Sequence, residues 1–321
     1  FDGDARVLSC IPLHSNGAFI FLLPALILGG SVVVLERFTA GDWLEAAERH
    51  RITHGFAVPT MLQALANDPR ARSSNLSALT TLVSGGAPLP GPLRDALACR
   101  FGDAFCHLWG LTEGLATLLR GTDNTFSTDC VGWPLPSVDL RIVTPDGGDT
   151  TAGIGEIVGR SAFLMSGYAV DPRNGETGPW LELDGVPYLR TGDLGEIDAD
   201  GRLVLKGRLK DLIISGGFNV YPSDIEAVIL GHVAVADAAV VGAPDPRWGE
   251  TPVGFIRLRP GASVTPEALR TWVNARVAAH QRLSAVRIVD DLPRNALGKV
   301  LKDELRAVLI ADATASSPAR G

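Results

Sequence analysis

The stretch Thr80–Pro88 reads TTLVSGGAP, and it combines the local signals that decide the fold class. Thr80–Val83 is short, apolar and β-branched, which predicts a buried strand. Ser84–Pro88 supplies glycines that permit a sharp turn. Pro92–Phe101 then has the spacing of an amphipathic helix. A strand, a glycine turn and a helix in this order predict a βα unit.

The same alternation extends toward the N-terminus, and no internal repeat accompanies it. We expect strands at Val32–Leu35 and Gly55–Val58, and helices at Asp42–His50 and Met61–Ala66. Alternating strands and helices predict a buried, largely parallel sheet, and hence an α/β fold.

The later sequence predicts two further structural parts. After residue 130, turn sequences such as Asp198–Gly201 separate short strands, which indicates a β-rich subdomain. Its expected strands are Leu140–Val143, Gly155–Gly159 and Arg202–Lys206. From residue 210 we expect an α+β domain with a helix at Ser223–Leu230, strands at Ala238–Val241 and Val253–Leu258, and a helix at Pro266–His280 capped by Thr265.

The predicted domain organisation follows from these changes of pattern. A partial N-terminal domain covers residues 1–209, with a βα subdomain to about residue 129 and the β-rich subdomain at 130–209. A small α+β domain covers 210–310. The low-complexity end, 311–321, is expected to be a disordered tail.

Composition excludes several classes of partner. The formal net charge is -7, and no basic run dominates a segment, so we expect no nucleic-acid partner and no attraction to an anionic membrane. The four cysteines, Cys10, Cys99, Cys106 and Cys130, lack the spacing of a zinc site. They are interpreted as reduced intracellular thiols, which favours a cytoplasmic location.

Gly17–Leu35 carries no charged residue and is about long enough to span a bilayer. However, Pro24 interrupts its first half, Gly29–Ser31 is a turn signal, and Val32–Leu35 is of strand type. We therefore expect a helix, a turn and a buried strand, without stable membrane insertion.

Two short motifs in the βα part suit nucleotide chemistry, and each has a plain structural alternative. The glycines of Ser84–Pro88 let a flat ring or a phosphate approach the backbone, as would those of any βα turn. Trp109–Glu113, WGLTE, places a hydroxyl beside a carboxylate, which suits a phosphate and Mg²⁺. A Thr-Glu pair is also typical of a helix N-terminus.

Two further motifs supply charged groups. In Tyr188–Asp193 and Gly207–Asp211, Asp193 can accept two ribose hydroxyls and Arg208 can contact the same sugar or its phosphate. A surface salt bridge is the alternative. Leu292–Lys299, LPRNALGK, presents a lysine on a glycine-flanked loop that can neutralise a phosphate or carboxylate. The alternative is a solvated lysine in a turn.

The order and wording of these four motifs resemble the adenylate-forming superfamily of acyl-CoA synthetases, firefly luciferases and peptide-synthetase adenylation domains. The resemblance extends to about residue 307. It implies an acyl-CoA synthetase-like fold whose small C-terminal domain is mobile. It also implies an ATP-dependent acid–thiol ligase, with ATP/AMP, Mg²⁺ and CoA as cofactors. A small carboxylic acid would be converted to acyl-AMP and pyrophosphate, and a thiol would then take the acyl group.

The resemblance also implies residue roles. The nucleotide-binding set comprises the adenine-pocket residues Gly86, Ala87 and Pro88, the α-phosphate contact Thr112, the Mg²⁺ ligand Glu113, and the ribose contacts Asp193 and Arg208. Lys299 would bridge the carboxylate and phosphate during adenylation, where its charge stabilises the transition state. Trp109 and Gly110 would also belong to the cofactor-binding residues, and together with Gly114–Leu118 they would shape the acyl pocket.

His14 would border the same acyl pocket, because Pro12–Gly17 resembles the corresponding family segment, although it is one residue shorter. A structural role for this histidine is the alternative.

Lys210 would be the hinge about which the small domain rotates between the two half-reactions. Rotation would withdraw Lys299 and bring a glycine-rich stretch toward a pantetheine tunnel. The residues of that stretch are Ser215–Asn219, including Gly216, Gly217 and Phe218. Ile213–Pro222 is similar to CoA ligases for fatty, aryl or malonyl-type acids, which favours CoA over a carrier protein as acceptor.

One family feature is missing from the sequence. Relatives carry a Ser/Thr/Gly-rich phosphate loop ending in lysine before the segment that starts at Pro12, and Phe1–Cys10 contains no such stretch. We therefore expect this chain to adenylate poorly, and its parent protein to be active. The alternatives are a non-catalytic remnant that binds AMP or CoA, and an enzyme that loads a carrier protein.

Overall fold

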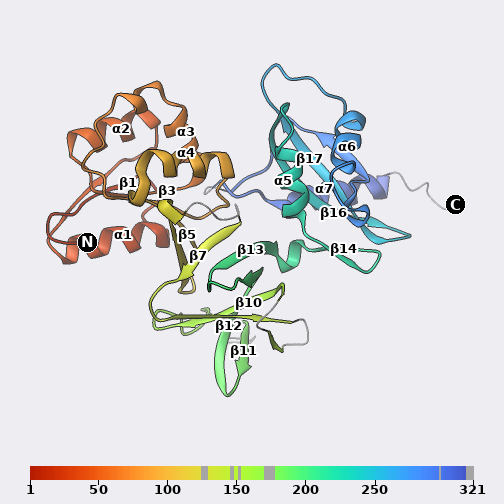
Figure 1. Cartoon of the computed structure of the whole chain (residues 1–321), viewed down its shortest axis with the longest axis horizontal. Helices are drawn as coiled ribbons and strands as arrows, with labels where there is room; N and C mark the ends of the chain where they lie inside the picture. The colour runs from red at the N-terminus through yellow and green to blue at the C-terminus, as the bar shows by residue number, and fades with distance from the viewer. Residues whose placement is uncertain (124–128, 145–147, 151–152, 170–177, 296–297, 316–321) are drawn as a thin grey trace. The chain divides into compact units, whose positions relative to one another are not determined.

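The computed structural model describes residues 1–123, 129–144, 148–150, 153–169, 178–295 and 298–315 (Figure 1). Its internal contacts divide the chain into two compact units. Unit 1 comprises Phe1–Thr191 and Glu196–Leu205, and unit 2 comprises Gly192–Gly195 and Lys206–Gly321. The predicted α/β fold is confirmed: one large mixed sheet and one smaller sheet are both accompanied by helices.

The first part of the chain alternates strands and helices as predicted. Its helices are α1 (Asn16–Ile27), α2 (Ala40–Arg49), α3 (Pro59–Asn67) and α4 (Gly91–Phe101), with short 3₁₀ turns at Pro69–Arg72, Gly102–Ala104 and Gly121–Asp123. Its strands are β1 (Arg6–Ser9), β2 (Ser31–Val34), β3 (His54–Ala57), β4 (Thr81–Ser84) and β5 (Phe105–Leu111).

These five strands are parallel and lie in the order β2-β1-β3-β4-β5. The order reverses after β2, and right-handed crossovers therefore place α1 on one face of the sheet and α2, α3 and α4 on the other. Figure 1 shows the two sets of helices on opposite sides of β1 and β3.

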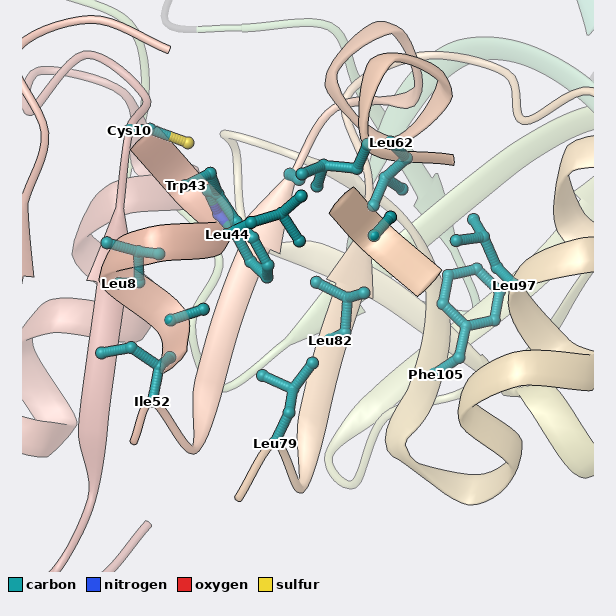
Figure 2. Close-up of a cluster of buried hydrophobic side chains, with 14 of the residues drawn as sticks. Leu8, Cys10, Trp43, Leu44, Ile52, Leu62, Leu79, Leu82, Leu97 and Phe105 are labelled. Carbon is teal, nitrogen blue, oxygen red and sulfur yellow. The ribbon is translucent and has the colours of Figure 1, made fainter. Parts of the chain in front are cut away.

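The main core of this part lies between the parallel strands and α2–α4. Figure 2 shows Trp43, Leu62 and Phe105 among the side chains of this core, and each is at most 1% exposed. Burying a side chain of this size contributes about 1.5–3 kcal/mol. The βα layer is therefore held by its apolar face, as the sequence pattern predicts.

β5 connects the parallel strands to the β-rich part. It pairs with β4 up to Ser84–His107 and then continues for four residues to Leu111, a further distance of about 13 Å. It also pairs along its length with the antiparallel β6 (Leu115–Arg120). Unit 1 thus changes from a parallel to an antiparallel sheet across a single strand.

The antiparallel strands continue the same sheet in the order β6-β7-β13-β12-β10-β8-β9. They are β7 (Cys130–Pro134), β8 (Val138–Val143), β9 (Asp149–Thr150), β10 (Gly155–Ser161), β12 (Val186–Ile197) and β13 (Leu203–Arg208), with β11 (Trp180–Leu183) paired to β12. The predicted tight turn at Asp198–Gly201 is confirmed, because the Gly201 N–H donates to the Asp198 carbonyl at 2.9 Å.

The apolar segment Gly17–Leu35 forms the predicted helix, turn and strand, as α1, Leu28–Gly30 and β2. Two details of the prediction were wrong. Pro24 lies inside α1 rather than interrupting it, and β2 is not buried, because it is an edge strand in which Val34 is 51% exposed. In the part of the chain that the structure describes, no helix is long and apolar enough to cross a membrane.

Unit 2 contains a smaller sheet in the order β15-β14-β17-β16, with β18 beside β17. Its strands are β14 (Ile213–Ser215), β15 (Phe218–Val220), β16 (Val235–Asp245), β17 (Gly249–Leu258) and β18 (Ala285–Ile288). Its helices are α5 (Pro222–Leu230), α6 (Pro266–Asn274) and α7 (Lys302–Ala315), with 3₁₀ turns at Leu209–Asp211 and Ala279–Gln281. Thr265 caps α6 as predicted, since its side chain accepts a hydrogen bond from the Ala268 N–H.

The predicted extension of α6 to His280 was wrong. The Asn274 side chain donates to the Leu283 carbonyl at 3.0 Å and accepts from the Leu283 N–H at 2.7 Å. These hydrogen bonds to a later segment end the helix at Asn274. Of the predicted tail, residues 311–315 belong to α7, and 316–321 lie outside the described residues.

Candidate functional site

In unit 1, the predicted site residues follow the carboxyl ends of parallel strands. His14 follows β1, Ser84–Pro88 begins at the end of β4, and Thr112–Glu113 follows β5. Carboxyl ends of parallel strands share one edge of a sheet, and ligands of open α/β sheets bind at this edge where the strand order reverses. Here the order reverses at β1 and β3. The topology therefore explains why these residues, far apart in sequence, belong to one edge.

Phe56 of β3 packs between two of these segments. A Cβ on Gly85 would lie 3.0 Å from the Phe56 ring, and a Cβ on Gly17, in the first turn of α1, would lie 3.1 Å from it. Glycine at both positions lets the loop after β4 and the start of α1 approach the same ring. His14, in the turn before α1, is exposed.

The loop after β4 exposes its backbone at Gly86. Gly86 has φ +86°, and the nearest atom to an added Cβ would be 3.6 Å away on Val58. The positive φ favours glycine here, while the space beside it remains open. Ala87 is half-buried and Pro88 is exposed. These are the properties of a surface against which a flat ring can lie.

His107 is a buried residue of this region that the sequence prediction missed. It pairs with Ser84 in the sheet register and is 7% exposed. Burial is the main reason that the pKa of His107 is lowered to about 4; the nearby Arg94 also lowers it, and a hydrogen bond to the Ser84 backbone acts in the opposite direction. The His107 Nδ1 and the Ser84 Oγ have no hydrogen-bond partner among the described residues. Only the register between β4 and β5 shows that Ser84 and His107 are neighbours.

The segment Thr112–Gly114, here called the Glu113 turn, joins β5 to β6. The alternative of a helix N-terminus at Thr-Glu was wrong, because a β-hairpin follows. Thr112 is exposed and Glu113 is half-buried. The Tyr168 hydroxyl donates to Glu113 Oε1 at 2.8 Å, and this hydrogen bond is the main reason that the pKa of Tyr168 is raised.

Two other predicted residues of β5 differ in their surroundings. Trp109 is 9% exposed and lies in the apolar core of the antiparallel strands, with Leu115 and Ile157. Gly110 is exposed, and a Cβ there would lie 2.9 Å from the Leu115 carbonyl oxygen.

In unit 2, the structure brings together the predicted ribose pair. Asp193 is 6% exposed, and its Oδ1 lies 2.7 Å from the Arg208 Nε. Lys299 is half-buried near both. Burial lowers the pKa of Lys299, Arg208 lowers it further, and Asp193 and Asp211 act in the opposite direction.

The segment Leu209–Asp211, here called the Lys210 segment, is tied to the first turns of α7 by ion pairs. The Lys210 Nζ lies 2.6 Å from Asp303 Oδ2. Arg306 pairs with Asp211 and with Asp303, and it donates to the Lys210 carbonyl at 3.1 Å. Because α7 begins three residues after Lys299, these contacts connect the predicted hinge to the predicted catalytic lysine. The sequence patterns gave no signal for Asp303 and Arg306.

The predicted CoA-facing glycines form the turn of the β14–β15 hairpin. Gly216 and Gly217 have φ +60° and +82°, as a tight two-residue hairpin turn requires. A Cβ on Gly216 would lie 2.8 Å from the Trp248 ring. Phe218 is 59% exposed and stacks on His280 with ring centroids 5.0 Å apart.

The described residues contain no cluster of three or more His, Cys, Asp or Glu side chains that could hold a metal ion. Glu113 is accordingly a single carboxylate. That arrangement fits Mg²⁺, which proteins commonly bind through one or two carboxylates together with substrate phosphates.

Family models match most of the chain. Residues 1–169 match the AMP-binding enzyme model, and residues 224–299 match the AMP-binding enzyme C-terminal domain model. Feruloyl-CoA synthase of an Amycolatopsis species is 37% identical over 308 residues, which cover 94% of this chain and 61% of that protein. The chain therefore spans about three fifths of the length of such relatives.

Solved structures give the same result. The amide bond synthetase McbA from Marinactinospora thermotolerans has a TM-score of 0.86 and 36% identity, over 95% of this chain and 61% of that one. The o-succinylbenzoate CoA synthetase MenE from Bacillus subtilis, in complex with its acyl-adenylate intermediate, has a TM-score of 0.81 and 31% identity, over 94% of this chain and 61% of that one. The order of the motifs, the two-unit fold and the family matches lead to one conclusion: this chain belongs to the AMP-binding enzyme family of the adenylate-forming superfamily.

Proposed function

We propose that the chain is the larger part of an AMP-forming acyl-CoA ligase that converts a carboxylic acid to acyl-AMP and then to a CoA thioester. The observation that carries this proposal is the buried Asp193 carboxylate held by Arg208 at 2.7 Å in unit 2, with Lys299 of the same unit in electrostatic contact with both. Two cations near each other in a half-buried site destabilise one another, and a bound anion relieves the repulsion. A phosphate with an adjoining carboxylate supplies such an anion.

The neighbouring residues fit the rest of an adenylate. The buried Asp193 carboxylate, fixed by Arg208 at 2.7 Å, is suited to ribose hydroxyls. Lys299 then offers a mobile ammonium group for the charge that develops when carboxylate oxygen attacks the α-phosphorus. Burial and Arg208 lower the pKa of Lys299, whereas Asp193 and Asp211 raise it and so favour the ammonium form.

In unit 1, the edge formed by β1, β4 and β5 supports nucleotide binding. Gly86, Ala87 and Pro88 offer a face for adenine. Thr112 would contact the α-phosphate. Glu113 would hold Mg²⁺, which supplies charge neutralisation for the phosphates when bound.

We infer an aromatic acid as the substrate class and CoA as the acceptor. This inference rests on the 37% identity to feruloyl-CoA synthase and on the likeness to o-succinylbenzoate CoA synthetase. The exposed ring of Phe218 and the glycine turn beside it offer an apolar, open surface of the kind that a pantetheine arm can follow.

The test measures each half-reaction separately, on this chain and on the full reading frame that contains it. ATP–pyrophosphate exchange with ferulate reports adenylation, and thioester formation from supplied feruloyl-AMP and CoA reports the second step. We expect both activities from the full reading frame, and weak exchange from this chain. Equal, robust exchange by the two proteins would disprove the expected impairment. AMP binding without turnover in the full reading frame would favour a binding remnant.

The likeness to the amide bond synthetase McbA favours a second candidate, in which an amine takes the acyl group. A competition assay with CoA, an amine and a phosphopantetheinyl carrier protein, each at equal concentration, separates the acceptors. Preferential amide formation would replace the CoA ligase proposal, and preferential loading of the carrier would support the carrier-protein alternative.

A further inference from the structure

The Glu113 turn is held from one side by the end of β10 and the segment that follows it. The Ser161 Oγ donates to the Gly114 carbonyl at 2.6 Å, and the Met165 N–H donates to the Glu113 carbonyl at 2.8 Å. The Tyr168 hydroxyl donates to Glu113 Oε1 at 2.8 Å. Three hydrogen bonds therefore fix a turn that lies 47 to 55 residues earlier in the chain.

Gly114 permits this close approach. It has φ +109°, and a Cβ at this position would lie 2.2 Å from the Phe163 carbonyl oxygen. Any other residue would push the two segments apart. The backbone on both sides of Glu113 is consequently fixed, and the remaining freedom is that of the Glu113 side chain.

Tyr168 removes much of that freedom. A glutamate side chain has up to three rotatable bonds, and ordering it on ligand binding has an entropic cost. The hydroxyl of Tyr168 engages one carboxylate oxygen, while Tyr168 as a residue is 47% exposed. A residue this exposed contributes little to a buried core, so packing alone does not account for Tyr168.

We propose that Tyr168 is a positioning residue for Glu113: by binding Oε1 it holds the carboxylate in one orientation and leaves Oε2 to a divalent cation that arrives with nucleotide phosphates. That Glu113 binds a cation rests on the proposed function. That Tyr168 orients the Glu113 carboxylate is independent of the proposed function. A pre-ordered carboxylate binds the cation without a further loss of rotamer freedom.

The first experiment uses the full reading frame that contains this chain, and it compares Tyr168→Phe with the wild type and with Tyr188→Phe. Tyr188 is a matched control, because its hydroxyl also donates to a carboxylate in unit 1, Asp139 Oδ2 at 2.6 Å. Electron paramagnetic resonance measures Mn²⁺ binding in the presence of ATP. We expect Mn²⁺ affinity to fall about tenfold in Tyr168→Phe and to be unchanged in Tyr188→Phe. Unchanged or tighter binding in Tyr168→Phe would overturn the proposal.

The second experiment needs no ligand. In chain labelled with ¹³C at the glutamate carboxyl carbon, the Glu113 resonance is assigned as the signal lost in Glu113→Gln. We expect Tyr168→Phe to move this signal toward the shift of a free glutamate, and Tyr188→Phe to leave it in place. An unmoved Glu113 signal rules out positioning by Tyr168. A wild-type full reading frame that fails to bind Mn²⁺ and ATP, while the expected carboxyl shift is present, would instead count against the proposed function alone.

Discussion

The Glu113 turn in unit 1 and the Lys210 segment in unit 2 both hold predicted functional side chains, but the chain fixes them by different means. The Glu113 turn is held by hydrogen bonds to its backbone carbonyls and by a glycine that admits Phe163. The Lys210 segment is held mainly by ion pairs from α7. One position therefore depends on shape, and the other on charge.

This difference has a mechanical meaning. Close backbone packing resists displacement, because every small movement creates a steric overlap or leaves a polar group unpaired. Partly exposed ion pairs contribute little net free energy and weaken in salt. A hinge has to release and re-form its contacts without unfolding its domain, so ion pairs suit the hinge role proposed for the Lys210 segment. A metal-binding carboxylate has to stay in place, so packing suits the role proposed for Glu113.

The largest expected effect concerns Lys299 of unit 2, and it should differ between the two half-reactions. Lys299→Ala should lower adenylation by about 10²- to 10³-fold, because a charge that stabilises the transition state is lost. Thioester formation from supplied acyl-AMP should persist. Pyrophosphate exchange and CoA-dependent release from acyl-AMP measure the two steps in the full reading frame. Equal loss of both steps would contradict the assigned role of Lys299.

Acid should lower the stability of unit 1 through His107, which lies on β5, the strand that ends at the Glu113 turn. The folded-state pKa of His107 is about 4, below the ordinary 6.5. Between these values the unfolded chain binds the additional proton, so stability falls as the pH drops from 6.5 through about 4. The full contribution is about 3 kcal/mol, at about 1.36 kcal/mol per pKa unit.

Urea unfolding of wild type and His107→Gln at several pH values tests this expectation. The difference in the free energy of unfolding between the two proteins should change over pH 4 to 6.5 and stay constant above pH 7. A difference that does not depend on pH would show that His107 does not remain neutral in the folded chain.

Gly114→Ala should destabilise unit 1 by about 2 kcal/mol or more, because two costs add: the positive φ at this position and the overlap of the new Cβ with the Phe163 carbonyl. Gly86→Ala is the matched control, because Gly86 also has a positive φ, +86°, but a Cβ there would make only an ordinary contact, 3.6 Å from Val58. It should cost about 1 kcal/mol. Thermal unfolding of both variants measures the contrast, and equal losses would remove steric packing as the cause.

The smallest effect is expected at the ion pairs. Arg306→Ala removes the arginine that pairs with Asp211 and Asp303, although Asp303 keeps Lys210 as a partner, and it should cost about 1 kcal/mol at low salt. Added 1 M NaCl should shrink this difference, whereas it should leave the effect of Gly114→Ala unchanged. The salt dependence of the melting temperature tests both. A salt-independent loss in Arg306→Ala would place the Lys210 segment in the same class as the Glu113 turn.

Much of the fold follows from local sequence pattern. Apolar runs and amphipathic stretches predict the βα alternation, because burial on one face imposes the period of each element. The end of α6 could not be predicted, since it depends on hydrogen bonds between Asn274 and Leu283. Exposure of β2 was also missed, because β-branched composition does not distinguish an edge strand from a central one.

The candidate site likewise contains residues that could be predicted from the sequence and residues that could not. Motif residues such as Ser84–Pro88 and Glu113 are identifiable from the sequence because they combine special backbone freedom with reactive groups. Tyr168 lies 55 residues from the carboxylate that it contacts, and Arg306 lies 95 residues from Asp211. Their roles depend on tertiary contacts that short motifs do not encode.

The continuation of β5 past the end of β4 also limits how this chain can change in length. A single inserted or deleted residue within Phe105–Leu111 would reverse the side of the sheet on which each later side chain lies. Trp109 would leave its apolar surroundings, and the register with both β4 and β6 would shift. Insertions and deletions that alter substrate preference should accordingly accumulate in surface loops, while the length of this strand stays fixed among functional variants.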